Sequence, residues 1–385
     1  MKFSGLPVFC IACIFLSCNN PVSKNVSSEN DRAKNEWAIL PFRKLDSANP
    51  ILSPGTASFI CPVSNQKVSW EEKDVFNPAV VVRNDTVFML YRAQDKIGKP
   101  DGTSRIGLAW SIDAVHFTRM PSPVLYPEND AYKKYEWQGG CEDPRIVEDS
   151  SGTYYMTYTS FDGKTARLFI ATSKNLLHWN KYGCVFAKAA NGKYMNAWSK
   201  SGSIISVYAN GKIVATKING KYRMYWGDKY IWAATSDNLI DWVPVETDEK
   251  QNYDSVYSGF DISKLKVIVP TRIGKFDNNI VESGPPAMLT DKGILLMYNG
   301  RNVPATGDTA LAEGTYAASQ VLLDKNDPDK TIDRMNTYFI RPDKSYETTG
   351  QVNQVCFIEG LAQFKNKWWL YYGTADSKIA VAVKE

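Results

Sequence analysis

The sequence predicts an all-β fold, a five-bladed β-propeller, from two repeats and from the near absence of helical periodicity. One turn pattern recurs with Ser111, Ser173 and Ser236 in equivalent positions, 62 and 63 residues apart. An apolar and aromatic strand pattern precedes each of these turns and occurs five times in all. Its copies are residues 87–91, 154–158, 222–226, 294–298 and 368–372. Repeats of roughly 60 to 70 residues built from short strands are typical of propeller blades.

The length and composition of the chain agree with a single repeat-built domain. The chain has 385 residues, of which 44% are hydrophobic and 12% aromatic, values typical of a globular protein. Five units of about 64 residues fill residues 66–385 and leave no room for a second domain. The formal net charge of +4 argues against a nucleic-acid-binding surface, which usually shows a basic excess.

Residues 1–18 have the features of a bacterial lipoprotein signal peptide. A charged start is followed by an apolar stretch from Leu6 to Leu16, too short to span a membrane comfortably. A small residue and Cys18 follow, and in such signals the cysteine becomes the lipidated first residue. A plain secretory signal cut nearby is the alternative. We expect an exported protein, lipid-anchored in the periplasm or at the cell surface of a bacterium, with residues 19–65 as a tether and lead-in strand.

The sequence gives no indication of metal or cofactor chemistry. The cysteines outside the signal are Cys61, Cys141, Cys184 and Cys356. They form no CxxC pair, which argues against a metal knuckle, although one disulfide could form in an oxidising compartment. The chain has two histidines, His116 and His178, and this scarcity argues against zinc hydrolases and Ser-His-Asp triads. We therefore expect no metal and no organic cofactor.

Polar clusters lie where the strands of the predicted blades begin and end. They are residues 76–79, 90–93, 140–145, 281–286 and 372–377. The inner strands of a propeller surround a central channel, and we expect these clusters to face it. Carboxylates and arginines together supply many hydrogen-bond acceptors and donors, which suits the hydroxyl groups of a sugar.

These clusters resemble glycoside hydrolase family 130. The resemblance rests on four motifs in order: an Asn-Pro-Ala to Tyr-Arg-Ala pair, Gly-x-Glu-Asp-Pro-Arg at 140–145, Gly-Pro-Pro at 284–286 and Tyr-Tyr-Gly-x-Ala-Asp at 371–376. Together they cover essentially all of residues 66–385. The resemblance implies a five-bladed propeller that acts on β-mannosides, as a phosphorylase or as a β-1,2-mannosidase.

The resemblance also implies that Asp143 is the general acid of an inverting reaction and delivers its proton through a sugar hydroxyl. This role requires a carboxyl group that stays protonated until the glycosidic oxygen leaves. Taken without the resemblance, Asp143 is equally a turn residue before Pro144, because Asp-Pro is an ordinary turn pair.

Two departures from the phosphorylase members favour hydrolysis. Where those members carry a His-Arg pair, this chain has Trp226-Gly227-Asp228, and Asp228 would repel phosphate. Where they keep small apolar residues before Gly-Pro-Pro, this chain has Glu282, a carboxylate that could deprotonate a water molecule. Arg145 and Arg167 remain basic and leave a phosphate site open.

Glu282 is the first candidate for the base, with a strand-end salt bridge as its alternative role. Glu246 and Asp228 are further candidates. Hydrolytic members are believed to use two glutamates around the water, whereas a solvated loop charge is the plainer reading of Glu246. The expected sugar-binding residues are Asn77, Arg92, Arg105, Glu142, Arg145, Arg167, Asp228 and Asp376.

The leading hypothesis is an exo-acting, inverting β-1,2-mannosidase whose partner is a mannose-containing oligosaccharide or glycan, with no nucleic-acid partner and a membrane contact only through the lipid at Cys18. The first rival is a β-mannoside phosphorylase, and a furanosidase-type propeller is the second. A non-catalytic glycan-binding surface lipoprotein is the third rival.

Overall fold

The computed structural model describes residue 1, residues 35–209 and residues 212–385. The expected signal peptide and Cys18 lie outside these residues. The described part is all-β, as expected, and its helical elements are single turns: α2 (Lys133–Glu136), α3 (Ser345–Thr348) and the 3₁₀ turn η1 (Ala189–Gly192). None of the helices described is long and apolar enough to cross a membrane.

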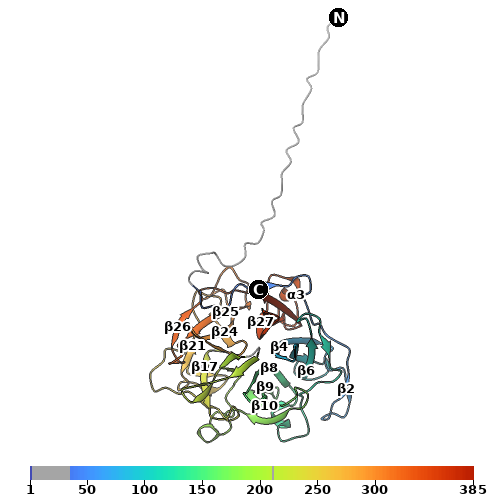
Figure 1. Cartoon of the computed structure of the whole chain (residues 1–385), viewed down its shortest axis with the longest axis horizontal. Helices are drawn as coiled ribbons and strands as arrows, with labels where there is room; N and C mark the ends of the chain where they lie inside the picture. Colours follow the sequence, from blue (N-terminus) through green and yellow to red (C-terminus); the bar gives the residue numbers. More distant parts are fainter. Residues whose placement is uncertain (2–34, 210–211) are drawn as a thin grey trace.

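Within a 15-stranded, a 6-stranded and a 4-stranded sheet, neighbouring antiparallel strands pair in groups, and these groups lie around a common centre (Figure 1). The first group is β4 (Asp74–Arg83), β5 (Thr86–Gln94), β6 (Ser104–Ser111) and β7 (Thr118–Arg119). The second is β8 (Gly140–Glu148), β9 (Tyr154–Phe161), β10 (Ala166–Ser173) and β11 (Asn180–Cys184). The third is β12 (Ser203–Ile204), β16 (Lys221–Trp226), β17 (Ile231–Ser236) and β18 (Val243–Pro244), with β15 (Lys217–Ile218) and β21 (Val267–Val269) paired to it.

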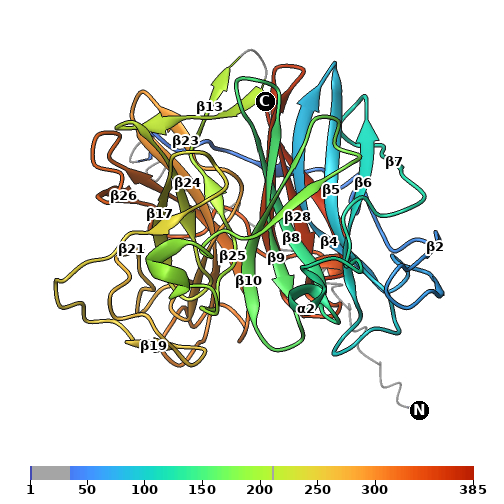
Figure 2. The same cartoon turned by 90° about the horizontal axis from the view of Figure 1, so that it is seen from below.

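The fourth group is β22 (Ile280–Ser283), β23 (Met288–Thr290), β24 (Gly293–Arg301), β25 (Tyr316–Leu323) and β26 (Thr331–Arg334), and the fifth is β27 (Cys356–Phe364), β28 (Lys367–Thr374) and β29 (Lys378–Lys384). Smaller pairs are β2 (Phe59–Ile60) with β3 (Lys67–Val68), β13 (Ser206–Ala209) with β14 (Lys212–Ala215), and β19 (Val256–Tyr257) with β20 (Phe260–Asp261). Near the centre, β4 contacts both β8 and β27, and Figure 2 shows β4, β8 and β28 running through the middle of the molecule.

The N-terminal strand β1 (Arg43–Lys44) pairs with the C-terminal strand β29, with Arg43 opposite Val383. The lead-in strand expected within residues 19–65 is therefore part of the last sheet. This pairing covers the edge of β29, which would otherwise present unpaired backbone groups.

All five predicted strand repeats are strands, and they lie within β5, β9, β16, β24 and β28. The repeated turns are architectural, as expected. The Ser173 hydroxyl accepts the backbone N–H groups of Asn175 and Leu176, and the Ser236 hydroxyl accepts those of Asn238 and Leu239. Short polar side chains that bond their own backbone in this way fix the turn.

The last tyrosine of the strand repeat is held by a buried carboxylate and a cation in four of the five groups, a pattern that was not predicted from the sequence. The hydroxyl donates to a carboxylate 2.8–2.9 Å away, and a lysine or arginine pairs with the same acid. The sets are Tyr91–Glu71–Arg119, Tyr158–Glu136–Lys181, Tyr298–Asp277–Arg334 and Tyr372–Glu347–Lys44. In the third group Trp226 stands at this place and its Nε1 has no partner among the described residues.

These sets predict a large stability effect. Lys181 lies 2.7 Å from the fully buried Glu136, so Lys181→Met removes the partner of a buried carboxylate. Because an unpaired buried charge is costly, we expect the free energy of unfolding to fall by about 3–5 kcal/mol in urea denaturation. Lys174→Met, at an exposed lysine, is the control. A loss below about 1 kcal/mol would show that the pair does not stabilise the fold in this way.

Candidate active site

Asp143 lies at the centre of a polar cluster where β4 and β8 meet. The strand β8 bulges between Glu142 and Arg145, and Asp143 takes a left-handed φ of 48° there. Asn77, in the matching bulge of β4, has the same φ of 48°. Its Nδ2 donates to Asp143 Oδ1 at 2.8 Å, and Arg92 Nη1 donates to the same oxygen at 3.0 Å. Such backbone outliers are frequent at functional sites.

The Asp143 carboxyl is 3% exposed, and a second cation faces it. Lys200 Nζ lies 3.3 Å from Asp143 Oδ2. Burial disfavours the charged carboxylate, but Arg92, Lys200 and the Asn77 amide outweigh that effect and hold the pKa of Asp143 well below its usual range. The low pKa favours the ionised form of Asp143 in the free site, whereas the acid role that the resemblance implies requires the protonated form.

Arg92 joins the two neighbouring acids of the Glu-Asp-Pro-Arg motif. Its Nη2 donates to Glu142 Oε1 at 2.8 Å while Nη1 holds Asp143, and its guanidinium lies over the Phe76 ring at 4.6 Å. Burial raises the pKa of Glu142 in spite of the Arg92 charge. The planar fork of arginine suits this bridging contact.

Lys200, which was not predicted from the sequence, is the cation that connects both halves of the cluster. Burial opposes its charge, but Asp143, Glu282, Glu142 and Asp228 together raise its pKa above the usual value. Its side chain keeps 19% exposure, so it remains reachable from solvent. Lys200 precedes the two-residue strand β12, in the group that departs most from the repeat, and no motif marks it.

Glu282 is a buried carboxyl in β22. The Ser201 hydroxyl donates to it, from a residue with a left-handed φ of 60°. Burial and the nearby Asp228 carboxylate raise the pKa of Glu282 to about 7, although Lys200 and Arg145 act in the opposite direction. Glu282 is thus poised to exchange a proton near neutral pH, as a catalytic base requires.

Two further predicted residues join the cluster. Asp228 follows β16 and accepts the Trp198 indole N–H at 2.8 Å, and burial raises its pKa. Asp376 follows β28 with φ of 49°, where burial and the Asp143 charge raise its pKa to about 6 against the effect of Arg92.

The tyrosines Tyr257 and Tyr316 were not predicted but face the same acids. Burial and the Asp228 and Glu282 charges raise the pKa of Tyr257 above its usual value. Burial and the Glu282 charge do the same for Tyr316. Tyr257 ends β19 and Tyr316 begins β25, and neither lies in the strand repeat, so their place beside these acids becomes visible only in the folded structure.

Three predicted residues are held elsewhere. Arg105 is buried in an ion pair with Asp95 at 2.7 Å, and Arg167 pairs with Asp162 at 2.8 Å. These placements differ from the sugar contacts that we expected, because both guanidiniums are occupied by neighbouring acids. Glu246 has a side chain 46% exposed and pairs with Lys193 at 3.0 Å, which agrees with a solvated loop charge better than with a base.

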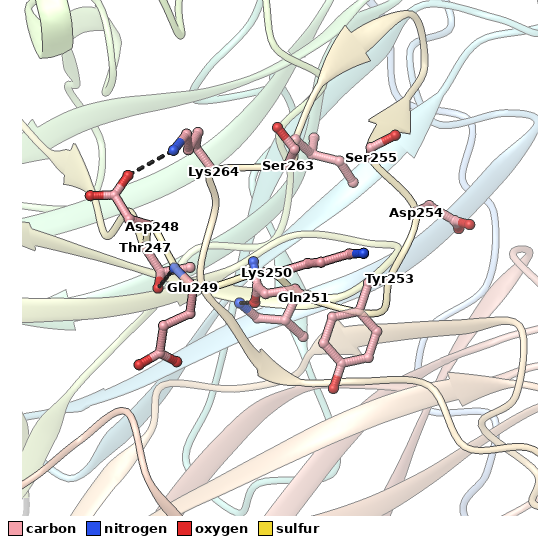
Figure 3. Close-up of a pocket in the computed structure, with 12 residues that line it drawn as sticks. Thr247, Asp248, Glu249, Lys250, Gln251, Tyr253, Asp254, Ser255, Ser263 and Lys264 are labelled. Carbon is pink, nitrogen blue, oxygen red and sulfur yellow. Dashed lines mark hydrogen bonds and ion pairs between the residues drawn. The ribbon is translucent and has the colours of Figure 1, made fainter.

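A pocket of about 320 Å³ in the loop after Glu246 is separate from the cluster (Figure 3). Its lining includes Tyr253, Asp254 and an ion pair of 2.7 Å between Asp248 and Lys264, and none of the cluster acids. Among residues 35–209 and 212–385, no three His, Cys, Asp or Glu side chains are arranged to hold a metal ion. The four cysteines of that part are free and buried, so the disulfide left open by the sequence does not form there.

The cluster thus contains carboxyl groups whose pKa values are displaced in opposite directions within one buried site. The charges around Asp143 hold its pKa below the usual range, whereas burial raises the pKa of Glu282 to about 7. Enzymes that act on glycosidic bonds use a pair of carboxyl groups with different pKa values as acid and base.

The chain belongs to glycoside hydrolase family 130. The sequence model of this family, described as beta-1,4-mannooligosaccharide phosphorylase, matches residues 43–385. The resemblance stated from the motifs is thereby confirmed.

Relatives of this chain include phosphorylases and hydrolases. It is 32% identical to the 1,2-beta-oligomannan phosphorylase of Thermoanaerobacter sp. (strain X514), over 82% of this chain and 91% of that protein. The crystal structure of a glycosyl hydrolase from Bacteroides ovatus is similar with a TM-score of 0.85 and 45% identity, over 91% of this chain and 95% of that one. The same similarity and coverage hold for a structure from work on family members that are glycoside hydrolases and target β-1,2-mannosidic linkages in Candida mannan.

Proposed function

We propose that this protein is an exo-acting, inverting glycoside hydrolase that cleaves β-1,2-linked mannosides on a five-bladed propeller. The five strand groups around one centre, each containing one copy of the strand repeat, support the blade count. Support for the linkage comes from the relative at 45% identity that belongs with hydrolases of β-1,2-mannosidic linkages. Export and a lipid anchor at Cys18 remain part of the proposal, carried by the signal sequence.

The observation that carries hydrolysis is the charge of the cluster. Six carboxyl groups surround three cations, and every cation is engaged by at least one acid. The acids are Glu142, Asp143, Asp228, Glu282, Glu359 and Asp376, and the cations are Arg92, Arg145 and Lys200. A phosphorylase needs cations free to hold a phosphate dianion, whereas this arrangement would repel one.

In this proposal Glu282 deprotonates the attacking water, and Asp143 supplies the proton of the leaving oxygen through a sugar hydroxyl. A bound sugar removes the remaining water from Asp143 and competes for its Lys200 contact, the longer of its two ion pairs at 3.3 Å. Both changes raise the pKa of Asp143 towards the protonated form that the acid role needs. Inversion implies a separation of the two carboxyl groups of roughly 6.5–9.5 Å, or more with a hydroxyl relay.

A panel of mannobioses that differ in linkage tests the substrate. We expect mannose to be released from the β-1,2 isomer and not from the β-1,4 isomer, with products followed by chromatography. Release from the β-1,4 isomer alone would overturn the linkage. No release from any isomer, with retained binding of mannan, would favour the non-catalytic glycan-binding rival.

Phosphorolysis is the second candidate, since relatives of this chain are phosphorylases and Lys200 keeps a partly exposed cation beside Asp143. It predicts mannose 1-phosphate as the product and a rate that depends on phosphate.

The pKa of Glu282 predicts the pH profile. A base must be ionised, and in the substrate complex Asp143 is protonated, so a pKa of about 7 for Glu282 means that kcat at saturating substrate falls about tenfold for each pH unit below 7. We expect this acid limb in the wild-type protein, from initial rates between pH 4 and 9. If the limb persists in Glu282→Gln and disappears in Glu246→Gln, the base is Glu246 instead.

A further inference from the structure

We propose that Arg145 is a positioning residue that ties the strand of Asp143 to the strand of Glu282, rather than a ligand of the sugar. The inference deepens the proposed function, because it assigns what fixes the acid and the base relative to each other. It replaces the sugar-binding role that the sequence suggested for this arginine.

The hydrogen bonds of Arg145 go to main-chain carbonyl groups of both catalytic segments. Its Nη1 donates to the carbonyl oxygen of Asp143 at 3.2 Å. Its Nη2 donates to that of Ser283 at 2.7 Å, and Nε to that of Gly284 at 3.1 Å. Ser283 and Gly284 directly follow Glu282, so one planar guanidinium spans the two strands that carry the proposed acid and base.

Arg145 has no exposed face with which to meet a sugar. It is 2% exposed, and its guanidinium lies 6.0 Å from the Phe357 ring. A lysine could keep the charge, but it could not reproduce three directed bonds, because its ammonium is a point charge without the arginine fork. The geometry of the contacts, rather than the charge alone, therefore carries the positioning role.

Glu359 completes the enclosure of this guanidinium. It lies in a bulge of β27 between Ile358 and Gly360, as Asn77 and Asp143 lie in bulges of β4 and β8. It is fully buried, and its Oε1 is 3.5 Å from Arg145 Nη1. Neither carboxyl oxygen has a hydrogen-bond partner in the part of the chain that the structure describes. Burying a carboxyl group without hydrogen bonds is costly, so the adjacent guanidinium is what stabilises Glu359 in this position.

Arg145 also acts on Glu282 through its charge, since it lowers the pKa of that carboxyl. Other groups face Glu282 from the surrounding elements and remain when Arg145 is changed. They are Lys200, Ser201, Asp228, Tyr257, Tyr316 and Glu359. Loss of the Arg145 charge alone is therefore expected to raise the pKa of Glu282.

Steady-state kinetics on β-1,2-mannobiose test the proposal with Arg145→Lys and Arg145→Met. We expect Arg145→Lys to lower kcat about 10- to 100-fold with KM within about twofold of wild type, because a displacement of the order of 1 Å at the reacting groups has an effect of this size. Its acid limb stays near pH 7, whereas in Arg145→Met the limb moves to higher pH. Arg334→Lys is the matched control. Arg334 also bonds a buried acid, Asp277, and a main-chain carbonyl, that of Pro270, and neither partner belongs to the cluster.

Glu359→Ala provides a second test should the Arg145 variants fail to fold. It frees the Arg145 guanidinium to turn, and we expect kcat to fall about five- to tenfold with KM unchanged. A rise in KM with unchanged kcat, in Arg145→Lys or Glu359→Ala, would overturn the proposal and return Arg145 to sugar binding. If the reaction proves to be phosphorolysis, the separate effects on kcat and KM are measured with phosphate as the second substrate. The positioning role of Arg145 can therefore be tested whether or not the reaction is hydrolysis.

Discussion

Asp143→Asn is expected to lower kcat on β-1,2-mannobiose by about 10²–10⁴-fold, the range that general acid catalysis contributes. Asparagine keeps the shape of the side chain and can still contact Arg92 and Lys200, but it cannot transfer the proton. The loss should be much smaller on an aryl β-mannoside with a good leaving group, because that group departs without protonation. Initial rates on the two substrates give the comparison.

Asp329→Asn is the matched control for this variant. Asp329 pairs with Arg223 and Lys266 and takes no part in the cluster, so its change should affect stability more than kcat. An equal loss on both substrates in Asp143→Asn would indicate that Asp143 holds the sugar and does not protonate the leaving oxygen.

The second large effect is expected at Glu282. Glu282→Ala removes the group that activates water, and we expect kcat to fall by about 10²–10⁴-fold. Sodium azide should restore turnover of an aryl β-mannoside, because the anion needs no base and can attack from the vacated side. In an inverting site the rescued product is the α-mannosyl azide, which NMR identifies.

A β-mannosyl azide, or full activity without Glu282, would contradict the role of this residue as the base. The corresponding change Glu246→Ala should give no azide product, because Glu246 is half exposed and paired with Lys193.

The repeats were sufficient to predict the all-β class and the positions of the central strands, because alternating turns and aromatic strands leave a regular trace in the sequence. They did not show that Arg43 and Lys44 pair with the C-terminal strand, since such pairing joins the two ends of the chain. The Tyr–carboxylate–cation sets were also missed, because each acid lies outside the strand repeat and reaches its tyrosine only in the folded structure.

The structure brings together five residues that the motifs named, in or beside bulges near the centre: Asn77, Arg92, Glu142, Asp143 and Asp376. The residue type alone did not show in which direction each side chain points. Arg145 and Arg105 were both predicted to bind a sugar, yet both side chains point into buried contacts.

Lys200 and Glu359 could not be found from the sequence, because their chemistry comes from neighbours contributed by other strand groups. Lys200 meets four acids from three groups, and Glu359 is an unremarkable strand residue until the bulge of β27 turns it towards Arg145.

The most direct test of the account is the product of β-1,2-mannobiose cleavage, followed by ¹H NMR with and without inorganic phosphate. If a carboxylate-activated water attacks with inversion, the mannose unit released from the non-reducing end first appears as α-mannose. Phosphate does not change the rate of its release. Formation of mannose 1-phosphate, with no cleavage when phosphate is absent, would contradict it.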